Sequence, residues 1–318
     1  MSGKVILVPQ YLSSFEFYNN ILKQVRNILV HGDSGEIVFD FSNTSKIEPL
    51  TIPNLLCLGF WIKSKSKSKP CIRIPYTFEA DILKSYLKNI GFLDLSIRYE
   101  IFRFEESPYS GIDSRKIDPL CGTLLFNSND NIDSVIRGIS YYIDPFSDKY
   151  LQKFDVSILS SIYDDNQLFK NEMSQFIFEL IVNSQNHGKS FSFTTLHAKH
   201  STKSIYISVS DCGKGFLRSL GEEDNVRMSS EMDAIFHGIY KRSSSKIYGL
   251  FNVIRRVLEL RGIVRIHSNN TQIIFTERIL NDFINMKLMQ DSNFYKYNVK
   301  NDVLFPGVHI ELEIPMLW

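Results

Sequence analysis

Three short stretches in the second half of the chain decide the fold. They are Glu179-Leu-Ile-Val-Asn183-Ser-Gln-Asn-His187-Gly188, Asp211-Cys-Gly213-Lys-Gly215-Phe216 and Tyr248-Gly249-Leu250-Phe-Asn-Val253. Hydrophobic spacing around the first predicts a helix over 172–186, and the run 204–210 predicts a strand that ends at the second. The third stretch opens another helix, which Gly262 ends. Two strands, 263–267 and 271–276, then form a hairpin.

The first stretch carries side chains suited to a metal-bound ligand. Glu179, Asn183 and His187 are spaced by four, so they share one face of the predicted helix. A carboxylate can orient a water, and a carboxamide oxygen suits hydrated Mg²⁺. The polar side of an ordinary amphipathic helix explains the same residues, so the stretch alone leaves both interpretations open.

The other two stretches are suited to a base and to phosphates. Asp211, at the end of a strand, can accept a hydrogen bond from an exocyclic amine, and Gly213 and Gly215 permit close backbone approach. The serines and lysine of 243–246 precede Gly249 at a helix N-terminus, where unpaired amides bind phosphate. Taken singly, a glycine-rich turn and serine capping explain these residues as well.

In this order and spacing, the three stretches resemble the GHKL ATP-binding family of gyrases, heat-shock chaperones, histidine kinases and mismatch-repair proteins. The resemblance covers residues 120–318 and implies a Bergerat fold, an α/β sandwich with ATP between helices and a mixed sheet. It implies that Glu179 positions or activates water, that Asn183 coordinates Mg²⁺ and that Asp211 binds the adenine amino group. The nucleotide contacts that it implies are Asn183, His187, Asp211, Gly213, Gly215, Phe216, Ser244, Ser245, Lys246, Gly249 and Leu250.

The resemblance also implies that residues 218–246 form a lid of the anti-sigma type. We expect this stretch to be polar and weakly anchored outside 234–240, and therefore mobile until Mg·ATP orders it. Ile247 departs from the family pattern, because it stands where the first lid glycine is usual. The final strand, 307–315, would close the sheet but lacks the usual threonine, and 277–306 form an insertion before it.

A P-loop is the rival interpretation of the first stretch, since Gly188-Lys189-Ser190 has the end of that motif. Asn183 stands where the motif needs its first glycine, and a helix rather than a strand precedes it. These two mismatches exclude a P-loop.

The first 106 residues alternate strand-like and helix-like segments. Strands are predicted over 4–9, 36–41, 71–74 and 97–104, and helices over 15–29, from Pro53, and over 78–89. The segments 37–48 and 86–92 resemble a STAS domain, the partner of anti-sigma serine kinases. The switch serine of such domains is missing, and Thr51 in that turn is either a substitute phosphorylation site or a plain loop residue. Pro108, Gly111 and Pro119 mark a linker over 107–119, which leaves 120–318 as the second domain.

Composition excludes several classes of protein. Hydrophobic residues make up 43% and charged residues 22% of the 318, which is ordinary for a globular protein. Lys and Arg number 36 against 35 Asp and Glu, so no basic field for nucleic acid exists. No apolar run is long enough to span a membrane. The four cysteines lie far apart without a Cys-x-x-Cys pair, which predicts reduced thiols, no zinc site and a cytoplasmic location.

The sequence therefore predicts an α/β regulatory protein that binds ATP and Mg²⁺, switches its lid and hydrolyses ATP through Glu179. Its partner would be an unidentified protein, of STAS or sigma-factor-like type, or a second copy in a homodimer. Two alternatives stay open: a kinase that phosphorylates a Ser or Thr of a partner, and a sensor that binds ATP without turnover. Neither a membrane nor nucleic acid is expected as a partner.

Overall fold

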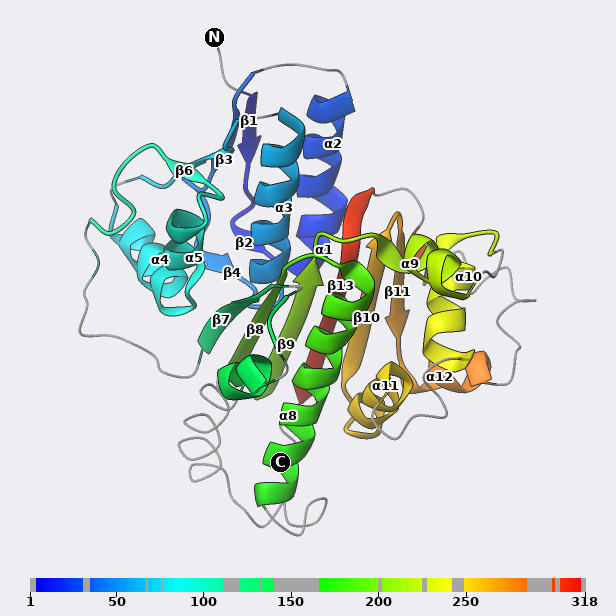
Figure 1. The fold of residues 1–318 in the computed structure, drawn as a ribbon. Helices are drawn as coiled ribbons and strands as arrows, with labels where there is room; N and C mark the ends of the chain where they lie inside the picture. The colour runs from blue at the N-terminus through cyan, green and yellow to red at the C-terminus, as the bar shows by residue number, and fades with distance from the viewer. Residues whose placement is uncertain are drawn as a thin grey trace.

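The protein is a mixed α/β structure with one parallel and one antiparallel main sheet (Figure 1). The computed structural model describes residues 4–30, 35–66, 68–75, 77–110, 112, 121–127, 129–131, 133–139, 166–199, 202–224, 228–241, 249–284, 299–300 and 304–315. Parallel strands occur between residues 4 and 104, and antiparallel strands occur from residue 121 onward. The predicted α/β class is confirmed at this level.

A seven-stranded sheet organises the second half, in the order β12-β11-β10-β13-β9-β8-β7. All its pairs are antiparallel. The predicted hairpin is confirmed as β10 and β11, and the last strand, β13, lies inside the sheet between β10 and β9. The strands are β7 Cys121–Phe126, β8 Ser192–Lys199, β9 Ser204–Asp211, β10 Ile263–Asn269, β11 Thr271–Phe275, β12 Val299–Lys300 and β13 Phe305–Pro315.

Helices cover one face of this sheet, which we call the front face. Figure 1 shows α8 (Asn166–Asn183) crossing it, with α11 (Leu250–Glu259) alongside. Their apolar side chains share one core with Ile207 and Val209 of β9 and Ile310 and Leu312 of β13. Helix α8 begins earlier than predicted and continues as the π-helical turn η2 (Ser184–Gly188). The other helices here are α9 Gly215–Asp224, α10 Glu231–Phe236, followed by the turn η3 His237–Lys241, and α12 Glu277–Ile284.

A four-stranded parallel sheet, ordered β1-β3-β5-β6, organises the first half. Because the strands follow one another in chain order, right-handed crossovers place the connecting helices on one face. Ile6, Phe39 and Ile72 point to that face and are buried. The elements are β1 Lys4–Leu7, β2 Tyr11–Leu12, α1 Ser14–Glu16, η1 Phe17–Ile21, α2 Leu22–Val30, β3 Ile37–Asp40, β4 Lys46–Ile47, α3 Thr51–Ser66, β5 Cys71–Arg73, α4 Phe78–Asn89, α5 Phe92–Arg98 and β6 Arg103–Phe104.

Two predicted boundaries in this half are wrong. Residues 97–104 were expected to be one strand, but only Arg103–Phe104 is a strand and Ile97 belongs to helix α5. Gly91, at φ 83°, starts that helix, and Ile97 is 43% exposed, so the alternation of apolar residues did not mark a buried strand face. Helix α3 begins at Thr51, two residues before Pro53, which still lies in the first turn, where its missing N–H costs no hydrogen bond.

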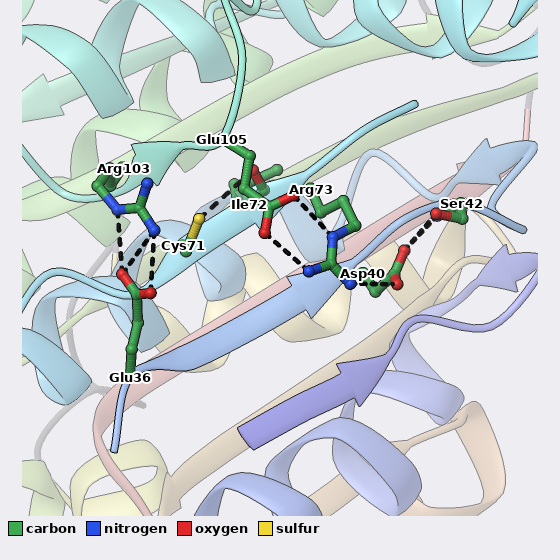
Figure 2. A network of polar contacts seen from close by, with 8 residues as sticks. All are labelled: Glu36, Asp40, Ser42, Cys71, Ile72, Arg73, Arg103 and Glu105. Carbon is green, nitrogen blue, oxygen red and sulfur yellow. Dashed lines mark hydrogen bonds and ion pairs between the residues drawn. The ribbon is translucent and has the colours of Figure 1, made fainter. Parts of the chain in front are cut away.

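Ion pairs cross the other face of the parallel sheet (Figure 2). Arg73 of β5 binds both carboxylate oxygens of Glu105, at 2.7 and 2.8 Å, and reaches Asp40 of β3 at 3.1 Å. Arg103 pairs with Glu36 at 2.8 Å. Because most of these side chains are partly exposed to solvent, each ion pair adds little to stability.

The two halves meet through α3. This helix contacts β8, β9 and β13 on the back face of the seven-stranded sheet, opposite α8. Phe193 of β8 and Phe305 of β13 belong to the same buried cluster as the helices of the first half. The antiparallel sheet is therefore covered on both faces, by its own helices at the front and by the N-terminal helices at the back.

Candidate functional site

A cleft opens between the end of α8, the start of α9 and strands β9 and β13. Its open volume is about 750 Å³, including space continuous with solvent. It is lined by seven of the residues singled out in the sequence: Glu179, Asn183, His187, Asp211, Gly215, Phe216 and Leu250. Gly213 and Gly249 adjoin these residues without lining the cleft. Ser244, Ser245 and Lys246 lie outside the described residues.

Asp211 is the most deeply placed charged group in the cleft. Its side chain is 2% exposed, and its Oδ1 accepts the backbone N–H of Gly213 at 2.7 Å and of Val308 at 3.2 Å. Burial raises the pKa of Asp211 to about 7, against the lowering effect of these two amides. The Ser184 hydroxyl nearby also favours the charged form, although no hydrogen bond of good geometry joins it to Asp211. Since both amides bind Oδ1, Oδ2 is the atom that can accept from a ligand.

The predicted polar face of α8 is present at the mouth of the cleft. Asn183 Nδ2 donates to Glu179 Oε1 at 2.8 Å, which fixes the amide so that its Oδ1 is the atom offered to a ligand. Both side chains are half-buried and line the cleft, and His187 follows one turn later in η2. A carboxylate, an amide oxygen and an imidazole from one helical segment therefore line the same cleft as Asp211.

Glycines let the backbone close around Asp211. A Cβ on Gly213 would lie 2.4 Å from the carbonyl oxygen of Gly188, and one on Gly307 would lie 1.9 Å from the carbonyl oxygen of Asp211. Gly307 also has φ +99°, a backbone conformation that residues other than glycine rarely adopt. Val308, next to it, lines the cleft.

Glu231 holds the start of α9, a role that the sequence did not indicate. Its Oε1 accepts the N–H groups of Phe216 at 2.8 Å and Leu217 at 3.2 Å, and also the hydroxyl of Ser268. Its Oε2 accepts from Asn269 Nδ2 at 3.1 Å. A carboxylate at a helix N-terminus pairs the amides that have no partner within the helix. Ser230 before it signals the start of α10, but no local pattern reveals the contact with α9.

The predicted lid is only partly as expected. We anticipated a weakly anchored polar stretch over 218–246, yet α9 and α10 are helices and their apolar side chains enter the main core. The expectation is wrong for Leu220 and Met232, which lie outside the stretch 234–240 and are buried at 3% and 4% exposure. The error arose because the apolar residues of these helices are interspersed with charged residues, so their helical spacing was not recognised in the sequence. The segment 242–248 lies outside the described residues, so the lid's behaviour at that end stays a prediction.

The back of the same two strands carries a buried polar network. Ser210 Oγ donates to Asn54 Oδ1 at 2.6 Å, and Asn54 Nδ2 donates to Glu311 Oε1 at 2.8 Å. Ser14 Oγ donates to Glu311 Oε2 at 2.6 Å. Burial raises the pKa of Glu311 to about 7, since the two donors and the more distant Arg265 offset only part of its desolvation. Strands β9 and β13 thus present cleft residues at the front and contacts to the N-terminal helices at the back.

Thr51 is not exposed as a phosphorylation site would be. Its side chain is fully buried at the start of α3, and its hydroxyl donates to the carbonyl oxygen of Glu48 at 2.7 Å. An enzyme that phosphorylates Thr51 would have to expose it first, so the plain structural interpretation applies in this conformation.

No protein-family model, curated protein or solved structure matches the chain. Among the residues that the structure describes, no cluster of three His, Cys, Asp or Glu side chains could hold a metal ion by itself. Within the same residues, no helix combines the length and the apolar character needed to cross a bilayer.

Proposed function

We propose that the cleft binds Mg·ATP and that residues 120–318 form a nucleotide-binding unit of the GHKL type, with a Bergerat fold. The observation that carries the proposal is the convergence of seven residues from α8, η2, β9, α9 and α11 on one cleft. These residues are separated by up to 71 positions in sequence, from Glu179 to Leu250. A shared cleft is not expected if each motif were only a turn or a solvated helix face.

The adenine would lie against Asp211, with its amino group donating to Oδ2. The buried carboxylate, fixed by two backbone amides on its other oxygen, is oriented before any ligand arrives. Triphosphate oxygens would lie toward Asn183 and the N-terminus of α11, which begins at Leu250 after its cap Gly249. Glu179 would orient the attacking water.

The side chains present fit Mg²⁺ as a partner of bound phosphate. Asn183 offers one amide oxygen, and Glu179 is held beside it. Mg²⁺ commonly keeps several waters and takes substrate phosphates as ligands, so a single protein oxygen is sufficient. The ion would neutralise phosphate charge, while Asn183 and Glu179 fix the position of the phosphates and of the water.

Binding is tested by calorimetry with ATP and Mg²⁺ on the wild type and on Asp211→Asn. The variant can keep Oδ1 for both amides and present an NH₂ group in place of Oδ2, which leaves the fold intact but opposes an exocyclic amine. We expect ATP affinity to fall by about 1–3 kcal/mol, or roughly 5- to 150-fold. Equal affinity in a folded variant would show that the base does not bind at Asp211.

Product analysis with labelled ATP distinguishes hydrolysis from the two alternatives. Free phosphate that disappears in Glu179→Ala, with ATP affinity retained, supports the ATPase, because a water-orienting group contributes about 10²–10⁴-fold to rate. Labelled protein partner indicates a kinase, and ATP binding without any product indicates a sensor. The partner, of STAS or sigma-factor-like type or a second copy, belongs to the same proposal.

A further inference from the structure

Two cysteines meet where α3 touches the loop that follows β9. Cys57 is in the middle of α3, and Cys212 comes directly after Asp211. The Cys212 thiol donates to the carbonyl oxygen of Cys57 at 3.6 Å, and the two thiols are close enough to interact electrostatically. They are 155 positions apart in sequence, and both are reduced in the structure.

The two thiols differ in their access to solvent. Cys212 is half-buried, whereas Cys57 is fully buried. Burial raises the pKa of the Cys57 thiol well above its ordinary value, and the neighbouring Cys212 adds to this effect. Cys212 is therefore the thiol that meets the oxidant first. Cys57 is the thiol that lies beside it and can form the disulfide with the oxidised sulfur.

We propose that Cys57 and Cys212 form a reversible disulfide, with a peroxide as oxidant, that links α3 to the loop carrying Asp211 and Gly213. The Cys212 thiol first loses its proton, and the thiolate attacks one peroxide oxygen. The O–O bond breaks, a sulfenic acid forms, and the leaving hydroxide takes up that proton as one water. The Cys57 sulfur then attacks the sulfenic sulfur, and its proton leaves with the hydroxyl as a second water. Each sulfur loses one electron overall, and a dithiol reductant reverses the reaction.

The consequence for the cleft rests on the proposed function. Closing the bond brings the sulfurs to about 2 Å and draws Cys212 toward α3. The backbone next to Cys212 cannot move independently, because Gly213 packs against the backbone of Gly188. Asp211 is therefore displaced from its two amide partners, and we expect ATP affinity to weaken at least threefold in the oxidised protein.

The experiment treats the full-length protein with hydrogen peroxide and maps the cysteines by mass spectrometry without reduction. We expect a peptide that links Cys57 to Cys212, and we expect dithiothreitol to remove it. It should be absent from Cys212→Ser, a substitution at a half-buried position, and from Cys57→Ala. Cys71→Ser is the matched control, since this buried thiol lies on β5 away from the pair, and it should leave the linked peptide unchanged.

Other outcomes overturn the proposal. Oxidation of Cys212 alone, with Cys57 still free, would show that the pair cannot close. A disulfide that leaves ATP affinity unchanged would overturn the effect on the cleft. If the reduced protein binds no ATP while the linked peptide still forms, the proposed function fails and the disulfide stands.

Discussion

Asp211 combines deep burial with two backbone hydrogen bonds to one of its oxygens. A carboxylate that is costly to ionise is normally protonated or paired with a cation. Here the pKa of Asp211 is raised to about 7, so its ability to accept from a ligand changes near neutral pH.

Adenosine affinity should therefore depend on pH. If the adenine amino group donates to the ionised carboxylate, affinity is full above about pH 7 and falls as pH drops below it, by up to roughly tenfold per unit. Adenosine is the right probe because it has no phosphate that titrates in this range. Calorimetry from pH 5 to 8 checks this on the wild type. Asp211→Asn should bind adenosine weakly at every pH, without the pH dependence of the wild type. Wild-type affinity that does not change with pH would contradict the contact between adenine and Asp211.

Gly213 should tolerate no side chain. In Gly213→Ala the new Cβ would lie 2.4 Å from a backbone oxygen and 2.5 Å from the Cα of Gly188, neither of which can rotate away. We expect a loss of about 1–3 kcal/mol in the free energy of unfolding, measured with urea. Gly221→Ala is the matched control: it adds a methyl group in open space on α9 and should stabilise by roughly 0.5–1 kcal/mol. Equal effects of the two substitutions would refute the close packing at Gly213.

At the scale of elements, β9 and β13 are the parts that join the cleft to the N-terminal half. Side chains alternate along a strand, so Val209 and Ile310 face the cleft while Ser210 and Glu311 face α1 and α3. A shift of either strand moves both faces together. The back-face network therefore fixes the two strands on which the cleft is built.

Glu311 should make stability depend on pH in a defined direction. Its pKa is raised in the fold from 4.5 to about 7, so the folded state binds more protons than the unfolded state between these values. Stability should fall as pH rises through this window, by up to roughly 3 kcal/mol from this group. Glu311→Gln keeps an acceptor for Asn54 and has no carboxyl group that titrates. Urea unfolding at pH 5 and pH 8 should show a smaller difference in the variant than in the wild type, and an unchanged difference would contradict the prediction.

At the scale of the molecule, the two halves share buried surface. Phe193 and Phe305 of the antiparallel sheet pack into the core of the N-terminal helices, and Asn54 joins Ser210 to Glu311. Separating the halves would expose this surface and leave buried acceptors unpaired. The folding free energies of the first and second halves are thus coupled.

We accordingly expect the full chain to unfold in one transition. Far-UV circular dichroism and the fluorescence of the protein should give the same urea midpoint. The most protected amides of α3 and β9 should exchange with the same free energy of opening. Two separated transitions, or α3 exchanging well before β9, would show that the halves unfold independently.

The sequence by itself determined the elements whose signals are local. The 3.6-residue spacing of apolar residues located α4 and α11, because burial of one helix face dictates it, and short runs of strand-forming residues located β3, β5 and β9. The same approach selected Glu179, Asn183 and Asp211 as candidates, because their chemistry and spacing are visible along the chain. It failed at 97–104, where chance alternation concealed helix α5, and at Leu220 and Met232 of the expected lid.

Only the tertiary structure decided which residues meet. Four contacts show this. Glu231 accepts from amides of α9, Asp211 accepts from the amide of Val308, Asn54 donates to Glu311, and Cys212 donates to the carbonyl oxygen of Cys57. The paired residues are between 14 and 257 positions apart. No local pattern encodes such pairs, because the backbone geometry that brings them together is set by packing of the whole core. For the same reason Thr51, which a turn in the sequence made look accessible, is buried once α3 lies against the sheet.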